Sequence, residues 1–170
     1  KAAALLGLEG TVTKEAFDRL ADNLHPLTGK KLTPRTKSNR RVGYDFTFSI
    51  PKSASLLFEL TRDERILDAF RASVRETMEE LEAGMATRVR QGGRDEDRKT
   101  GNMVWGEFVH TTTRPGDDGL PDPHTHMHVY AFNITYDQEE RRFKAGQFGD
   151  IKRDAPYYEA AFLARFAKRM

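Results

Sequence analysis

The sequence contains no cysteine and no long apolar run among its 170 residues. Without cysteine the chain can form neither disulfides nor thiolate-ligated zinc sites, and this composition fits a reducing cytoplasm. No stretch is apolar for long enough to span a bilayer, and no signal-peptide pattern is present. Phosphate-binding glycine loops, internal repeats and low-complexity tracts are also missing. We therefore expect a cytoplasmic protein that has no membrane partner.

The remaining composition is ordinary for a globular domain, with 38% hydrophobic and 32% charged residues. The net charge of +2 is too small to indicate a nucleic-acid partner by itself. A chain of this length can bury a sizeable core, so we expect one domain over residues 1–170. The first residue is lysine, and the last helical pattern has no stop signal, so we expect a piece excised at both ends.

Three of the five histidines alternate within residues 121–133. Alternation is the period of a β-strand, so His124, His126 and His128 are predicted to lie on one face. His110 ends the preceding apolar run, and a polar loop separates the two segments, as in two neighbouring antiparallel strands. This layout brings His110 beside His126 and His128 and favours a metal site. A solvated polar face or a tag-like histidine tract are the alternatives, but a tract would lack the apolar residues 129–132.

Residues 43–50 show the clearest strand pattern, with Tyr44, Phe46, Phe48 and Ile50 on one face. Asp45 falls on the opposite face of this strand. It is either a hydrogen-bonding surface residue or, if it faces the histidines, a group that orients a metal ligand or accepts a proton.

The other segments predict mainly helices. Expected helices cover residues 14–24 after an N-cap at Thr13, 53–60 after a cap at Ser53, 63–86, and a last helix after Asp154. Residues 87–91 and 102–110 are expected strands, with a charged turn at 92–101 between them and a short strand near Phe143. The predicted fold is α+β, with a central, mainly antiparallel sheet, helices packed on it and the histidine strands in the middle.

Lysines and arginines are concentrated in the loop 27–41. They are Lys30, Lys31, Arg35, Lys37, Arg40 and Arg41. The loop is either simply solvated or a contact to a polyanionic backbone, and the sequence leaves both open.

Three segments, residues 39–53, 108–114 and 122–133, together resemble conjugative relaxase domains of the TrwC/TraI (MobF) type, within the HUH single-strand endonucleases. Their order and spacing match over nearly the whole chain. The resemblance implies the palm-like sheet of HUH nucleases. It also implies that His110, His126 and His128 hold a divalent metal ion, with His124 outside the ligand set.

The same resemblance gives roles to further residues. Asp45 would orient a histidine and help to activate the nucleophile. Arg40, Arg41, Lys52 and Arg114 lie near the ends of the matching segments. Each is either plain surface charge or a contact to phosphate. Three imidazoles suit manganese, zinc or nickel at least as well as magnesium, so the identity of the ion stays open.

The activity that the resemblance implies is metal-dependent, site- and strand-specific nicking and rejoining of DNA at an origin of transfer. A tyrosine near the native N-terminus attacks the phosphate, leaving a 5′-phosphotyrosine link and a free 3′-hydroxyl. None of the tyrosines here matches that position, so we expect the nucleophile upstream and this chain alone to be inactive. Implied partners are single-stranded or hairpin DNA, relaxosome accessory proteins and a C-terminal helicase region of the full-length chain.

Two other functions fit parts of the pattern. One is a non-catalytic single-stranded-DNA-binding module that keeps the three-histidine metal site. The other is an unrelated three-histidine metalloenzyme. A cupin site needs a glutamate shortly after the alternating histidines, and residues 129–133 contain none. The hydrolase pattern H-x-H-x-D-H has no counterpart after His128 either.

Overall fold

The computed structural model describes residues 2–34, 39–117 and 119–170. Arg35 and Lys37 of the basic loop lie outside this range. Contacts divide the chain into two compact units. The first unit comprises Lys1–Tyr44, Glu82–Gly106 and Tyr130–Lys152, and the second comprises Asp45–Leu81, Glu107–Val129 and Arg153–Met170. The single domain expected from the sequence stays a prediction, and each unit is described by itself.

The helices and strands follow one another as α1 (Ala2–Leu5), α2 (Lys14–Ala21), β1 (Gly43–Ser49), α3 (Lys52–Thr61), α4 (Glu64–Ala83), β2 (Ala86–Gln91), β3 (Arg94–Lys99), β4 (Trp105–Thr112), β5 (Pro123–Phe132), β6 (Thr135–Asp137), β7 (Arg142–Lys144), β8 (Gly146–Gln147), α5 (Gly149–Arg153) and α6 (Ala155–Arg169). This is the predicted α+β content. In the described part of the chain no helix is both long and apolar enough to cross a membrane.

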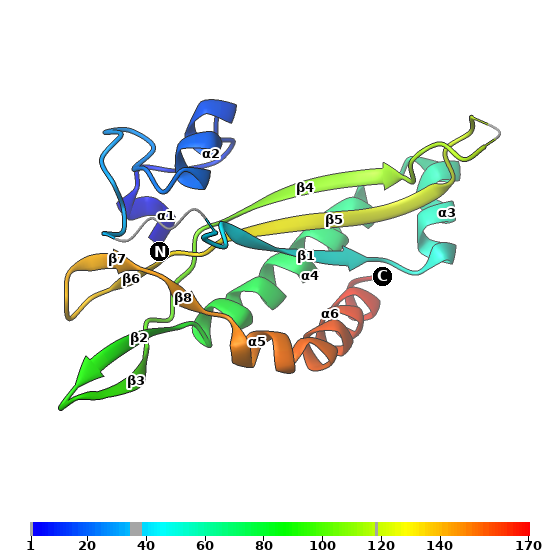
Figure 1. Ribbon diagram of the computed structural model, residues 1–170. Coiled ribbons are helices and arrows are strands. Elements are labelled where there is room, and N and C mark those ends of the chain that lie inside the picture. Colours follow the sequence, from blue (N-terminus) through cyan, green and yellow to red (C-terminus); the bar gives the residue numbers. More distant parts are fainter. Residues whose placement is uncertain (1, 35–38, 118) are drawn as a thin grey trace. The chain divides into compact units, whose positions relative to one another are not determined.

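The sheet that carries the histidines has the strand order β1-β5-β4. Strand β5 runs opposite to both of its neighbours (Figure 1), so the sheet is antiparallel as predicted. Only one histidine strand, β5, lies in the middle. Strand β4 is at the edge, which corrects the expectation that both would be central.

The second unit has an aromatic core beneath this sheet. Phe48 of β1 contacts Phe162 of α6 edge-on, with ring centroids 5.2 Å apart. Phe162 also packs against Phe70 of α4 at 5.9 Å. Arg75 of α4 donates to the Glu107 carboxylate on β4. These contacts place the helices on one face of the strands, and Asp45, Thr47, Phe108 and His110 on the other face are exposed.

The first unit holds the smaller sheets, β3-β2-β8 and β6-β7. One apolar cluster of this unit consists of Ala2, Leu6, Leu20, Val104, Phe132 and Ile134. The first residue of β1 is Gly43, and the lack of a side chain matters there. A Cβ at this position would lie 2.5 Å from the carbonyl oxygen of Ala131 and 2.7 Å from the Tyr130 ring. No larger residue fits this close approach of two strands.

The charged turn predicted at residues 92–101 is instead a β-hairpin. Only Gly92 and Gly93 form the turn, with φ of 56° and 84°. Two consecutive positive φ angles are typical of the two-residue hairpin turn that matches strand twist. Gln91 then pairs with Arg94, and the charged residues that follow form strand β3.

Two helix boundaries also differ from the prediction. Thr13 caps α2 as predicted, because its hydroxyl accepts a hydrogen bond from the Ala16 amide. The helix ends at Ala21, since Asn23 takes a left-handed conformation with φ of 63°. Ser53 is not a cap. The N-cap of α3 is Pro51, and Ser53 lies inside the helix.

Candidate metal centre

The histidines of β5 lie on the open face of the strand. His124, His126 and His128 are half-buried, whereas Thr125, Met127 and Val129 between them have no exposed surface. This alternation follows from the strand period of two, with the three buried side chains turned toward the helices. We call this open side the histidine face; it is formed by Asp45, Thr47, Phe108, His110, His124, His126 and His128.

The rings of His110, His126 and His128 form a triangle on this face. Their centroids are 5.2 Å apart for His110 and His126, 5.7 Å for His110 and His128, and 5.2 Å for His126 and His128. Three imidazoles ligating one ion tetrahedrally, with nitrogens about 2.1 Å from it, would have centroids about 5.3 Å apart. The spacing of the three rings therefore fits a shared ion.

The orientations of the three rings fit a metal site less well than the distances between them do. Among residues 2–34, 39–117 and 119–170, no three histidine or acidic side chains are arranged so that they could hold a metal ion as they stand. The three donor nitrogens would come together through rotation of side chains that are at least partly exposed. Such rotations are fast and leave the backbone in place.

Hydrogen bonds fix which nitrogen of two rings is available as a ligand. Nδ1 of His128 lies 2.8 Å from Oδ2 of Asp45, and Nδ1 of His126 lies 2.9 Å from the carbonyl oxygen of His124. Both partners accept hydrogen bonds, so in the neutral form of each ring Nδ1 carries the proton and Nε2 has a free lone pair. A ligating histidine usually donates its other ring N–H to a carboxylate or a carbonyl.

Asp45 reaches this site because β1 is paired with β5. Its side chain is 48% exposed, and that of His128 is 37% exposed. The Thr47 hydroxyl, one residue further along the same face, lies 3.4 Å from Nδ1 of His128. The carboxylate thus contacts the imidazole at a position where both side chains remain accessible to solvent.

His124 is separate from the triangle. Its ring stacks on that of His126, with centroids 4.9 Å apart, and its carbonyl group orients the His126 ring. In this arrangement the contribution of His124 to the site comes from its backbone.

The four predicted phosphate contacts have different surroundings. In the first unit, Arg40 donates to the carbonyl oxygen of Ala21 at 2.6 Å, and the Arg41 guanidinium lies over the Tyr44 ring at 5.2 Å. In the second unit, Arg114 is exposed in the loop after β4. Lys52 is engaged within the protein, where its ammonium binds the Asp122 carboxylate and the carbonyl oxygen of Pro123.

Phe108 is a residue of the histidine face that the sequence interpretation did not select. It is 46% exposed although it is large and apolar. It stands two positions before His110 on β4, so the strand period places it on the same face. That spacing is the signal in the sequence, but the apolar residues on either side of Phe108 conceal it.

Comparisons with known proteins identify the family of this chain. The sequence model described as TrwC relaxase matches residues 1–170. The multifunctional conjugation protein TraI of Escherichia coli is 39% identical over 134 residues, which make up 78% of this chain and 7% of that protein.

Solved structures of a conjugative relaxase, TrwC, share the fold. One, a metal-bound complex with oriT DNA, has a TM-score of 0.89 at 30% identity and covers 99% of this chain and 57% of its own. Another, a complex with a 27-mer DNA comprising the recognition hairpin and the cleavage site, has a TM-score of 0.88 at 31% identity, over 99% and 59% of the two chains. The present chain thus spans only part of each of these proteins.

Proposed function

The chain belongs to the TrwC relaxase family, and from that premise we propose that it holds a divalent metal ion against the scissile phosphate of single-stranded or hairpin DNA. The reaction served is nicking and rejoining at an origin of transfer during conjugation, in the cytoplasm. The observation that supports this proposal is the grouping of His110, His126 and His128 with Asp45 on one open sheet face.

In the proposed site, His110, His126 and His128 supply three neutral nitrogen ligands. Neutral ligands leave the full charge of a bound ion, which would polarise a non-bridging phosphate oxygen. Asp45 keeps the proton of His128 on Nδ1 and so presents Nε2 to the ion. Manganese, zinc, nickel and magnesium are the candidate ions, and the all-imidazole set favours the first three.

We further propose that the attacking tyrosine comes from outside these residues. A phenolate oxygen would form a bond to phosphorus, the bond from phosphorus to the 3′ oxygen would break, and the departing 3′ oxygen would take up a proton from water to give the 3′-hydroxyl. Each of the five tyrosines of this chain contacts another aromatic ring. Tyr44 stacks on Phe148 at 4.2 Å, and the Tyr157 hydroxyl donates to the Glu80 carboxylate. The 170-residue chain alone would then bind DNA without forming the covalent link.

The proposed DNA path uses exposed groups of the second unit. Arg114 offers a cation for a phosphate, and Phe108 offers a ring on which a base can stack beside the histidines. In the first unit Arg41 is the exposed candidate. The Arg40 guanidinium, already bound to a carbonyl group, would contact a phosphate only with its remaining N–H donors.

The experiment compares this chain with a version extended by the natural upstream residues. Both are incubated with manganese and a labelled single-stranded oligonucleotide that carries the origin of transfer. We expect DNA binding by both and a covalent protein–DNA adduct only for the extended version. Binding without any adduct from either version would favour the non-catalytic DNA-binding module. Absence of both binding and metal uptake would overturn the proposal.

A further inference from the structure

Residues 50–55, which follow β1 and include the first turn of α3, hold the beginning of the histidine strand. The Ile50 amide donates to the carbonyl oxygen of Thr125 at 3.2 Å. The Thr125 amide donates in turn to the hydroxyl of Ser55 at 3.0 Å. Both backbone groups of Thr125 are therefore fixed by residues of this segment. Thr125 has no exposed surface and stands between His124 and His126.

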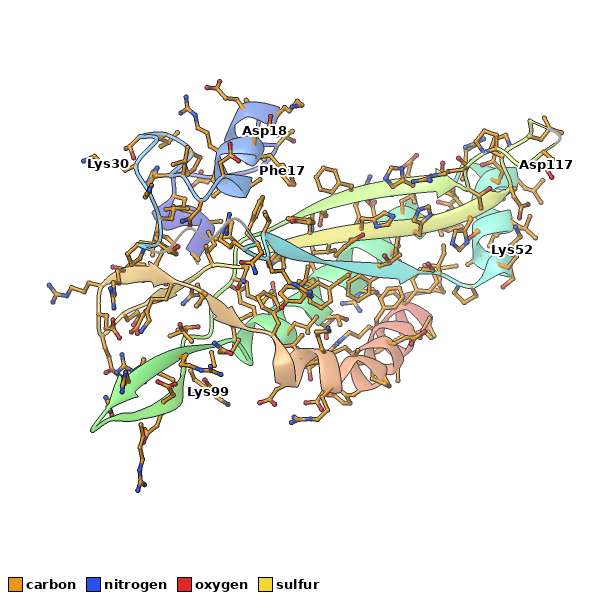
Figure 2. The ribbon with its side chains drawn as sticks, in the orientation of Figure 1. Phe17, Asp18, Lys30, Lys52, Lys99 and Asp117 are labelled. Carbon is orange, nitrogen blue, oxygen red and sulfur yellow. The ribbon has the colours of Figure 1, made fainter. Side chains whose placement is uncertain are left out.

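Lys52 adds a charged contact to the same place. Its ammonium donates to the Pro123 carbonyl oxygen at 2.8 Å and pairs with the Asp122 carboxylate. Figure 2 shows Lys52 on α3, at the end of the strands where the loop marked by Asp117 projects. The base of that loop is closed by the Thr113 amide, which donates to the Asp122 carbonyl oxygen at 2.9 Å. Asp122 thus joins three elements, namely the end of β4, the start of β5 and the first turn of α3.

We propose that Lys52 is a positioning residue for the histidine strand rather than a contact to phosphate. An ammonium group has three N–H donors, and two of them have acceptors within the protein. A phosphate would have to compete with the Asp122 carboxylate for this cation. The contact between Lys52 and Pro123 acts on the site through the backbone. Pro123 directly precedes His124, and the carbonyl oxygen of His124 orients the His126 ring.

The role of Lys52 should be local. An isolated ion pair that is half-exposed contributes little to global stability, and the side chains of Lys52 and Asp122 are 49% and 66% exposed. Loss of the contact is therefore expected to loosen residues 122–126 without unfolding the unit. Only the consequence for metal binding rests on the proposed function; the mechanical role does not.

The first test measures hydrogen exchange of single backbone amides by NMR. In Lys52→Gln we expect the Thr125 amide to exchange at least about tenfold faster, with the Val129 amide unchanged. Asp122→Asn should have a smaller effect in the same direction. Lys52→Arg should restore protection, since a guanidinium can reach both acceptors. Lys14→Gln is the matched control, because Lys14 forms an exposed ion pair with Asp18 in the first unit. Unchanged exchange in Lys52→Gln would overturn the proposal.

The second test separates positioning from phosphate contact. If Lys52 positions the strand, Lys52→Gln should shift the His126 ring signals and weaken manganese binding several-fold. The salt dependence of single-stranded DNA binding should then stay the same. A lost phosphate contact would instead lower the slope of log K against log salt by about 0.7. A lower slope with normal His126 signals would overturn the proposal. If the wild type binds no manganese, the proposed function fails, and the exchange measurement still decides the role of Lys52.

Discussion

Oδ2 of Asp45 lies 2.8 Å from Nδ1 of His128, although 83 positions separate the two residues in the sequence. The pairing of β1 with β5 produces this contact. It fixes the proton of the imidazole on one nitrogen and leaves the other available. One hydrogen bond between neighbouring strands thus links an acidic residue to the proposed metal site.

Replacing two of the proposed ligands should remove the metal. In the double variant His126→Ala, His128→Ala we expect no bound manganese or zinc, because a single remaining imidazole cannot compete with water for the ion. Both side chains lie on the open face, so circular dichroism should show an unchanged fold. Elemental analysis measures the metal, with His25→Ala as the control that loses a loop histidine. Unchanged metal content in the double variant would remove the site assignment.

Asp45 should tune the metal affinity without being required for folding. Asp45→Ala is expected to weaken metal binding about 10–100-fold, the usual effect of losing a hydrogen-bond partner of a ligand. Asp45→Asn keeps an acceptor oxygen and should lose less. Isothermal titration with manganese measures both variants. Equal affinities in the wild type and Asp45→Ala would show that this carboxylate does not support a ligand.

Phe108 should contribute to single-stranded DNA binding by stacking. Phe108→Ala is expected to cost about 1–3 kcal/mol, the range measured for base–aromatic stacking. Phe108→Trp should keep the affinity. Leu60→Ala is the control, because Leu60 is an exposed apolar residue on α3 of the same unit. Fluorescence anisotropy with a labelled oligonucleotide measures these affinities, and equal losses in Phe108→Ala and Leu60→Ala would contradict stacking.

Arg114 should contribute a phosphate contact that depends on salt. Arg114→Gln is expected to reduce the slope of log K against log salt by about 0.7, the value for one contact to a single strand. Arg114→Lys should preserve the slope. The exposed Lys168 of α6 provides a control of equal charge change, Lys168→Gln. If both glutamine variants change the slope equally, the effect is one of overall charge.

Acid should weaken the contact between α4 and α6. The pKa of Glu80 is lowered, because the Tyr157 hydroxyl and then Arg165 donate hydrogen bonds to its carboxylate. A lowered folded pKa gives stability that is present above the ordinary value of 4.5 and is lost as the pH falls through the folded pKa.

Glu80→Gln should therefore lower Tm at pH 7, by about 2–4 °C for a loss on the order of 1 kcal/mol. The difference from the wild type should shrink as the pH is taken well below 4.5. Scanning calorimetry over a pH series measures this. A difference in Tm that does not vary with pH would mean that the ionised carboxylate is not the cause.

Several features of this protein followed from the sequence alone. The alternation at His124, His126 and His128 gave a strand with one polar and one buried face, because successive side chains of a strand point in opposite directions. The same rule placed the side chains of Asp45 and Phe48 on opposite faces of β1. Thr13 was recognised as a helix cap because its side chain can satisfy a free amide. These are local properties, and a few neighbouring residues determine each of them.

Other features depended on strand pairing and packing. The sequence could not show that β5 is central and β4 lies at the edge, nor that β1 brings Asp45 to His128, since these pairings join distant segments. It also could not show that Lys52 is bound to Asp122 and Pro123, because this contact joins distant segments of the chain. The charged strand β3 was missed because its stability comes from pairing with β2 rather than from an apolar pattern. Local periodicity thus determined which side chains share a face, and the tertiary structure decided which faces meet, because contacts between distant segments depend on the whole fold.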